Sequence, residues 1–124
     1  MSQFALYREP VVLDVVKHRH LRLLPLTDHS MSGAMHACFL AAAEFTAAAR
    51  DFVIMFVRDE SADPSRVQPI VLLGVVTGEN LFVDGTRWDA RYVPAFIRRY
   101  PFWTTRLEGI ADPVVMIDAC PSIC

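Results

Sequence analysis

Four histidines and three cysteines are the side chains of this chain best suited to bind a metal, and their spacing decides whether they can. His18 and His20 alternate along a basic segment, so both imidazoles would face one side of a strand. A zinc site needs further ligands, and neither His29 nor His36 lies at ligand spacing from this pair. We therefore expect solvated or core histidines, with no metal site and no cofactor.

The cysteines are spaced poorly for zinc or redox chemistry. Cys120 and Cys124 are four positions apart, which fits neither a thioredoxin-like C-x-x-C pair nor a zinc ribbon. Cys38 makes the count odd, which favours a reducing compartment over a disulfide framework. Charged residues also interrupt the amino-terminal segment where a signal peptide needs an apolar core. The expected location is the cytoplasm.

Acidic side chains gather near a turn signal. Glu79, Asp84 and Asp89 could offer oxygen ligands to a hard cation, but the alternating acidic loop that binds calcium is absent from the sequence. Turn formation and capping explain them more simply. Asp84 with Gly85 predicts a tight turn, and Asp89 could cap the helix that holds Tyr92.

Aromatic and arginine side chains crowd the segment between Gly78 and Phe102, which contains no nucleophile beside a base. Such a mixture could form a surface that binds an acidic or aromatic ligand, or a protein partner. The predicted contact residues are Asn80, Asp84, Trp88, Asp89, Tyr92, Arg98, Arg99 and Tyr100. The structural alternative is that the aromatic rings fill the core while the arginines pair with the nearby acidic residues. No catalytic residue is predicted.

The sequence predicts an α+β fold for the elements that must position these residues. The fold has a mixed or mostly antiparallel sheet packed by one long alanine-rich helix and one shorter helix. Apolar runs bounded by charge, proline or turn residues predict the strands. These runs are Val11–Val16, Leu21–Leu26, Phe52–Val57, Ile70–Val76, Leu81–Val83 and Val114–Ile117. The continuous run at Phe52–Val57 is typical of a central strand.

Two helices and one hairpin complete the predicted fold. Alanine content predicts the long helix over Ala34–Arg50, with Ser30 or Ser32 as its cap. The shorter helix covers Tyr92–Tyr100, where Pro94 is tolerable only in the first turn and Pro101 ends the helix. A turn at Thr77–Asn80 predicts an antiparallel hairpin between the two strands that flank it.

Composition limits the function classes. A length of 124 residues with 53% hydrophobic content predicts one domain over residues 1–124. The net charge of −2 removes the electrostatic case for a nucleic-acid partner. The longest weakly polar stretch, Ala34–Ala49, is shorter than the ~20 apolar residues that a membrane-spanning helix needs. We expect no nucleic acid and no membrane span.

Three segments together carry a family resemblance: AAAEFTAAARDFVIMFVRD, VLLGVVTGENLFVDGTRWDARYVPAFIRRYPF and VVMID. Their motifs are the Glu44-Phe45 pair, the GENLFVD turn, the W-x-x-x-Y-V-P-A segment and the RRYPF helix end. In this order and spacing the chain resembles the bacterial SapC family. It departs from the family at Phe52-Val53, where tyrosine-proline is usual. Typical members continue beyond the aspartate-containing strand, so the resemblance implies that a carboxy-terminal half is missing.

The resemblance implies a function but no chemistry. SapC-like proteins are associated with bacterial surface layers and serum resistance, and no catalytic residue carries over to this chain. We expect an accessory or interaction protein, associated with the surface layer, whose partner is a surface-layer or envelope protein. If the missing half normally covers the final strand, this chain should expose an apolar edge there and self-associate. The alternatives are a small-molecule-binding domain that uses the aromatic and arginine surface, and part of an enzyme whose site is completed by the missing half.

Overall fold

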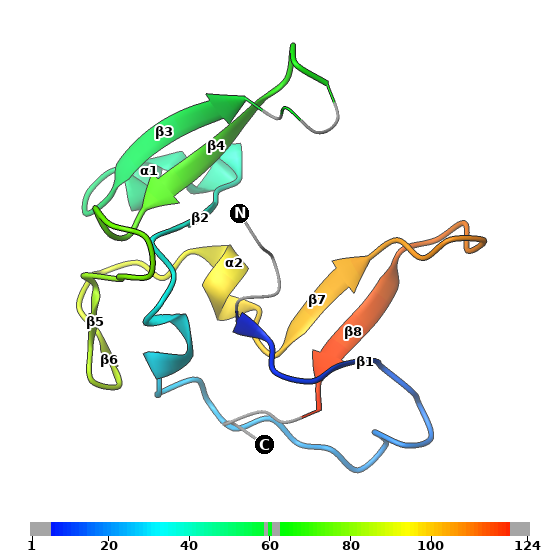
Figure 1. Ribbon diagram of the computed structural model, residues 1–124. Helices are drawn as coiled ribbons and strands as arrows, with labels where there is room; N and C mark the ends of the chain where they lie inside the picture. Colours follow the sequence, from blue (N-terminus) through cyan, green and yellow to red (C-terminus); the bar gives the residue numbers. More distant parts are fainter. Residues whose placement is uncertain (1–5, 59, 61–62, 120–124) are drawn as a thin grey trace. The chain divides into compact units, whose positions relative to one another are not determined.

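Short antiparallel strands dominate the computed structural model, which describes residues 6–58, 60 and 63–119 (Figure 1). The strands form two three-stranded sheets and one two-stranded sheet. Within these residues every helix is short, and none is long and apolar enough to cross a membrane. The fold is therefore mostly antiparallel β with short helices. The mostly antiparallel sheet of the sequence prediction is confirmed, and the long helix is wrong.

The chain divides into two compact units, and each is described by itself. The first unit is formed by Thr27–Arg98. The second combines Ser2–Leu26 with Arg99–Cys124 and so joins the two ends of the chain. The expectation of a single domain stays a prediction.

The sheet of the first unit has the strand order β2-β4-β3. Its strands are β2 (Ala37–Phe39), β4 (Val67–Leu72) and β3 (Val53–Arg58). The middle strand, β4, pairs with both neighbours, and its Val71 lies opposite Cys38 on one side and Ile54 on the other. Val71 and Cys38 are fully buried, so the apolar centre of this sheet is built around β4.

The predicted helix over Ala34–Arg50 is wrong, because its first half is extended. Residues Ala37–Phe39 pair with β4, and only η3 (Ala42–Glu44) and α1 (Phe45–Ala48) are helical. The predicted caps belong to a separate turn, η2 (Ser30–Ser32), in which the Ser32 hydroxyl donates to the carbonyl of His29 at 2.8 Å. Pairing with β4 buries Cys38 completely, and this tertiary contact outweighs the helix propensity of the alanines.

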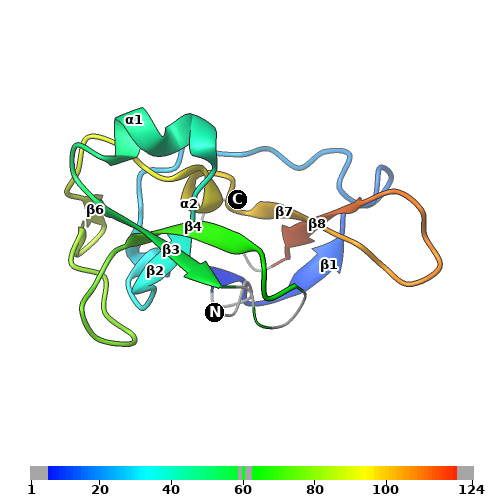
Figure 2. The same ribbon diagram turned by 90° about the horizontal axis from the view of Figure 1, so that it is seen from above.

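Strand β3 is confirmed as a strand, but its predicted position in the centre of the sheet is wrong. β3 has β4 on one side and no strand on the other among the described residues, and β4 is the central strand. One face of β3 contacts α1, where the rings of Phe45 and Phe56 meet edge to face with centroids 6.0 Å apart. Figure 2 shows α1 on one side of the β3 and β4 pair.

The strand predicted over Ile70–Val76 corresponds to β4, which begins earlier than predicted, at Val67, and ends earlier, at Leu72. Gly74 comes next, and a Cβ there would lie 1.9 Å from the carbonyl oxygen of Glu79, so only glycine fits this close approach. The predicted hairpin across Thr77–Asn80 is wrong. Its turn does form, and the amide of Leu81 donates to the carbonyl of Leu73 at 2.8 Å, but no strand pairing follows.

The hairpin forms one turn later instead. Strand β5 (Val83–Asp84) pairs with β6 (Arg87–Trp88) across Gly85, whose φ of 64° is the left-handed conformation that this tight turn requires. The predicted Asp84-Gly85 turn is confirmed. Two paired residues on each side make this a small element that depends on its packing for stability.

The shorter helix is confirmed in place but not in length. Helix α2 spans Ala95–Arg98, whereas the prediction covered Tyr92–Tyr100. The carbonyl of Pro94 accepts from the amides of Ile97 and Arg98, so the proline lies at the start of the helix as predicted.

The sheet of the second unit has the order β1-β8-β7. Its strands are β1 (Pro10–Val12), β8 (Val114–Asp118) and β7 (Phe102–Thr105). Val11, Ile117 and Phe102 form one row across the three strands, with Ile117 almost fully buried. The last predicted strand is thus confirmed and central, while β7 is an element that the sequence analysis missed.

The two predicted amino-terminal strands are largely wrong. The first is reduced to β1, because the Asp14 carboxylate accepts from the amides of Val16 and Lys17 and turns the chain there. The second, Leu21–Leu26, contains no strand. The side chains of Val15 and Val16 are exposed, so this apolar run does not indicate a buried strand.

Candidate functional site

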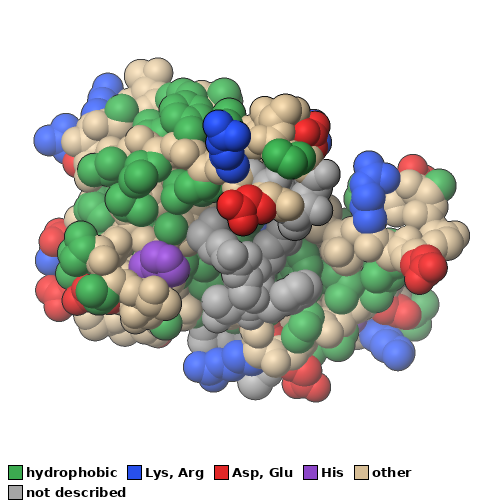
Figure 3. All heavy atoms as spheres, turned by 45° about the horizontal axis from the view of Figure 1, so that its top comes forward, with side chains coloured by type: hydrophobic (Ala, Val, Ile, Leu, Met, Phe, Trp, Pro, Cys, Tyr) green, Lys and Arg blue, Asp and Glu red, His purple; other side chains and the backbone are tan. Residues whose placement is uncertain are grey.

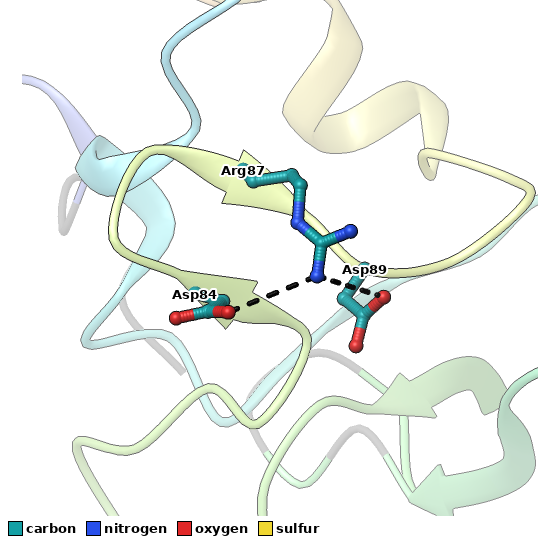
Figure 4. Close-up of polar contacts among 3 residues, drawn as sticks. All are labelled: Asp84, Arg87 and Asp89. Atoms are coloured by element: carbon teal, nitrogen blue, oxygen red, sulfur yellow. Dashed lines mark ion pairs between the residues drawn. The ribbon is translucent and has the colours of Figure 1, made fainter.

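The predicted acidic residues of the β5–β6 hairpin lie around one arginine (Figure 4). Arg87 Nη2 lies 3.7 Å from Asp84 Oδ2 and 3.5 Å from Asp89 Oδ1. All three side chains are largely exposed, so these ion pairs are screened by solvent. Asp89 does not cap a helix as predicted, because its side chain faces Arg87 and its amide donates to the carbonyl of Phe82. This is the surface pairing that the structural alternative predicts.

Asn80 is buried and its side chain is used inside the first unit. Its amide nitrogen donates to the carbonyl of Ser32 at 3.1 Å, and its amide oxygen accepts from the amide of Phe82 at 2.9 Å. These bonds satisfy polar atoms that would otherwise be buried without partners. Asn80 therefore ties the turn before β5 to η2 and offers little to a ligand.

Trp88 belongs to an aromatic cluster of the first unit. Its ring is stacked on Phe82 at 6.1 Å and is tilted toward Phe52 at 6.2 Å. Its indole N–H donates to the carbonyl of Tyr92 at 2.8 Å. The single donor of the indole is thus satisfied within the chain.

Glu44, Tyr92 and Arg98 form the most connected polar group of the first unit, which we call the Glu44 cluster. One carboxylate oxygen of Glu44 accepts from the Tyr92 hydroxyl at 2.5 Å and from the amide of Ala95 at 2.8 Å. The other oxygen accepts from the amide of Ala41 at 2.9 Å, half of a capping box at the start of η3. The cluster joins the helical segment to the residue that opens α2.

Arg98 completes the cluster on its exposed side. Its guanidinium donates to the Tyr92 hydroxyl at 3.3 Å and lies over the Tyr92 ring, 5.4 Å from the centroid. Burial alone would raise the pKa of Glu44, but the hydrogen bonds and the charge of Arg98 outweigh it, and the net pKa is lowered. Burial and the bond to Glu44 raise the pKa of Tyr92. The carboxylate stays charged and the phenol stays protonated.

Arg99 lies in the second unit, in a buried aromatic cluster. The Tyr7 ring lies 4.0 Å from Trp103 and 5.5 Å from Tyr100, centroid to centroid. The Tyr7 hydroxyl donates to the carbonyl of Phe102 at 3.0 Å and is hydrogen-bonded to Arg99. Burial raises the pKa of Tyr7 although Arg99 acts in the opposite direction.

Asp118 is the buried carboxylate of the second unit, with 1% of its surface exposed. It accepts from the Tyr100 hydroxyl at 2.8 Å and from the amides of Arg8 and Glu9 at 3.2 and 2.9 Å. These donors come from the segments that flank the sheet, so Asp118 joins the two ends of the chain. A buried carboxylate needs such donors to stay in place.

Histidines and cysteines build no metal centre among the described residues, where no three potential ligands gather. His18 accepts through Nδ1 from the amide of Asp14 at 2.8 Å and so stabilises a turn. His29 packs against Trp88, and burial lowers its pKa although Asp28 acts in the opposite direction. Cys120 and Cys124 lie outside the described residues.

Strand β3 exposes the largest group of apolar side chains of any strand in the described chain. Val53, Met55 and Phe56 expose 61%, 42% and 59% of their surface, and Val57 and the neighbouring Val67 are also exposed. The view of this end of the molecule in Figure 3 shows hydrophobic side chains gathered together. Single exposed apolar residues are ordinary, but a contiguous group along a sheet edge marks an interaction surface.

The predicted site residues are divided between the two units. Tyr92 contacts Trp88 and Arg98, Asp84 and Asp89 surround Arg87, and Asn80 is bonded internally, while Arg99 and Tyr100 belong to the second unit. Sequence analysis did not select Asp118, Tyr7 or Glu44 as site residues. A signal existed for Asp118, since it is a charged residue that directly follows the apolar run Val114–Ile117.

Comparison with known proteins adds one finding. A search of curated proteins and a search of solved structures each found no match. The family model SapC matches residues 13–123, nearly the whole chain, and confirms the resemblance carried by the sequence motifs. The chain belongs to the SapC family.

Proposed function

We propose that this SapC-family chain is a non-catalytic interaction protein that binds a protein partner through the open edge of β3. The observation that carries the proposal is the exposure of Val53, Met55 and Phe56 on a strand that has no neighbouring strand on one side within the described part of the chain. An edge strand offers a row of backbone donors and acceptors to an added strand, and its alternate side chains supply apolar contacts. Its partner is an extended segment of a surface-layer or envelope protein.

The charged groups support a non-catalytic role. A general acid or base works best when its pKa is close to the working pH. The pKa of Glu44 is lowered and the pKa values of Tyr7 and Tyr92 are raised, so each shift leads away from neutrality. Within the described residues, the best-bonded carboxylates, Glu44 and Asp118, accept from several donors, which suits a structural role.

The aromatic and arginine surface is the weaker candidate for binding. Trp88 and Asn80 use their polar atoms in bonds within the first unit, and Arg87 is paired with two carboxylates. Arg98 is exposed, but it is stacked over Tyr92. Since a ligand would have to displace these contacts, β3 is the better interface.

The test is a pull-down from a bacterial envelope fraction, read by mass spectrometry. Met55→Lys places a charge on the open edge of β3, and recovery of the partner should fall by about tenfold or more. Val75→Lys is the matched control, because Val75 is 84% exposed in the loop after β4 and should tolerate lysine. Arg98→Ala tests the aromatic and arginine surface and should leave recovery unchanged.

Circular dichroism must show that the variants keep the wild-type fold. Equal recovery of the same envelope protein by the wild type and Met55→Lys would overturn the assignment of β3. Loss of recovery with Arg98→Ala alone would transfer the function to the aromatic and arginine surface.

A further inference from the structure

We infer that, when no envelope partner is bound, the strand added to β3 in solution is β3 of a second copy of this chain, paired antiparallel about a two-fold axis at Met55. The inference rests on the proposed function, in which β3 is an interface, and names the occupant of that edge in the protein alone. Two copies of the β2-β4-β3 sheet then become one continuous six-stranded sheet. Their shared apolar residues and the symmetry of the pairing lead to this partner and this register.

Self-pairing requires that the same strand complement itself. From Val53 to Val57 the strand is entirely apolar, so any antiparallel overlap of this part sets apolar side chains against apolar side chains. The one charged residue of the strand, Arg58, lies at its end. A two-fold interface requires this self-complementarity, because both copies contribute the same surface. If one residue contacts a second residue of the partner, that second residue contacts the first residue of the partner.

Symmetry restricts the register. Side chains opposite each other in a sheet project from the same face, and a two-fold axis perpendicular to the sheet keeps every residue on its own face. A residue can therefore lie opposite itself or opposite a residue an even number of positions away. The registers that pair most of β3 are those centred on Ile54, Met55 and Phe56.

Apolar overlap excludes two of these registers. Centring on Ile54 or on Phe56 pairs only three of the five apolar residues from Val53 to Val57 with one another, and the Ile54 register also runs past the start of the strand at Val53.

The register centred on Met55 pairs all five apolar residues with one another and leaves Arg58 opposite Phe52, which precedes the strand. It sets Val53 opposite Val57 and Ile54 opposite Phe56, and Met55 lies opposite its own counterpart. Pairs of aromatic and β-branched residues are among the favourable cross-strand pairs. The outward backbone groups of the strand gain partners at the same time.

The exposed area sets the strength of this dimer. The apolar side chains exposed on β3 and at Val67 amount to roughly 400 Å² in each copy. Strand pairing covers only part of this area, so the two copies together bury less than roughly 800 Å², which is below the size of standard specific interfaces. We therefore expect a weak dimer, with a dissociation constant of about 10–100 μM.

Cysteine cross-linking tests the register. Cys120→Ser and Cys124→Ser remove two thiols, and Cys38 is kept because it is fully buried. In this background, Met55→Cys places two thiols opposite each other with Cβ atoms about 5 Å apart, close enough to oxidise to a disulfide with copper phenanthroline. Val53→Cys is the control, since its two copies lie about 13 Å apart along the strands.

The control is stringent because Val53 is more exposed than Met55, so random collisions would favour it. We expect a covalent dimer with Met55→Cys and several-fold less with Val53→Cys. Sedimentation of the wild type from about 5 to 300 μM should show a monomer–dimer equilibrium, and Met55→Lys should abolish it. Val75→Lys, in the loop, should leave it unchanged.

Other results would overturn the inference. Equal cross-linking at the two positions would indicate unspecific contact, and a monomer throughout the concentration range would exclude the dimer. If the wild type is monomeric while Met55→Lys still loses its envelope partner, β3 remains an interface and only the second copy is excluded. If Met55→Lys changes neither measurement, the proposed function fails as well.

Discussion

Removal of the Glu44 carboxylate should destabilise the first unit, because three donors converge on it. Glu44→Ala leaves the Tyr92 hydroxyl and the amide of Ala95 without their acceptor, and both are only partly exposed. It also removes the bond to the amide of Ala41, which water can replace because this site is exposed. The segment that opens α2 then loses its polar attachment to the helical segment.

The expected loss follows from the burial of these donors. A hydrogen bond to a charged group contributes about 1.5–3 kcal/mol when buried, and partial exposure reduces that figure. For Glu44→Ala we expect a loss of about 2–3 kcal/mol in the free energy of unfolding. Glu44→Gln keeps one acceptor oxygen for Tyr92 and Ala95 and should lose about 1 kcal/mol.

The stabilising contribution of Glu44 should also depend on pH. The pKa of Glu44 is lowered in the folded state relative to about 4.3 in an unfolded chain, so the unfolded state binds the proton more tightly. The contribution is therefore complete above the unfolded pKa and is lost as the pH falls through the folded pKa. Glu44→Gln lacks this titration, so the stability difference between wild type and Glu44→Gln should narrow in acid.

Urea unfolding followed by circular dichroism measures both effects. With a slope of about 1.5 kcal/mol per molar urea, Glu44→Ala should lower the midpoint by about 1.3–2 M at pH 7. A double-mutant cycle with Tyr92→Phe should give a coupling energy of about 1 kcal/mol. A midpoint within about 0.3 M of the wild type, or a difference from Glu44→Gln that stays constant down to pH 3, would refute the reasoning.

Substitutions at Asp118 and at Arg87 should show that removal of a buried charge lowers stability more than removal of an exposed charge. Asp118→Asn replaces a carboxylate oxygen that accepts from the surrounding hydroxyl and amide donors with an amide nitrogen that cannot accept. It should therefore lower the free energy of unfolding, measured with urea, by about 2–4 kcal/mol, and Tyr100→Phe should lower it by less than half as much. An Asp118→Asn variant as stable as the wild type would contradict the structural role of this buried carboxylate. Arg87→Ala removes two exposed ion pairs and should change stability by less than about 0.5 kcal/mol, whereas a larger loss would mean that the hairpin depends on them.

Local sequence patterns predicted the elements that local chemistry decides. The apolar runs at β3 and β8 form strands, and Asp84-Gly85 forms its turn, because side-chain type and the conformational freedom of glycine act within a few residues. Pro94 opens α2 for the same reason. None of these features needs a distant partner to be recognised.

The long helix failed because a distant strand decided the conformation of Ala37–Phe39. These residues extend in order to pair with β4, about thirty positions further on, and Cys38 gains complete burial in return. Helix propensity differs by less than about 1 kcal/mol per residue among ordinary residues, which burial of side chains readily exceeds. Of the predicted long helix, only Ala42–Ala48 is helical, because no strand pairing competes with helix formation there.

The polar clusters were unpredictable for a related reason. Glu44 and Tyr92 are 48 positions apart, and Asp118 meets the amides of Arg8 and Glu9 from the other end of the chain. Neither separation has a periodicity that a single sequence displays. The predicted site residues were chosen as neighbours in sequence. Asn80, Tyr92 and Tyr100 use polar atoms for long-range attachment, whereas Asp84, Trp88 and Asp89 bond to residues close in sequence.

The failure at β3 differs in kind and leads back to its function. A strand that is apolar on both faces is normally covered on both, so the sequence predicts a central strand. In the structure this strand has one neighbour and exposes Val53, Met55 and Phe56. Proteins usually protect an apolar edge of this kind. A second β3 would give the strand the central position that its composition predicts, so amides of residues 53–57 should exchange hydrogen more slowly as protein concentration rises.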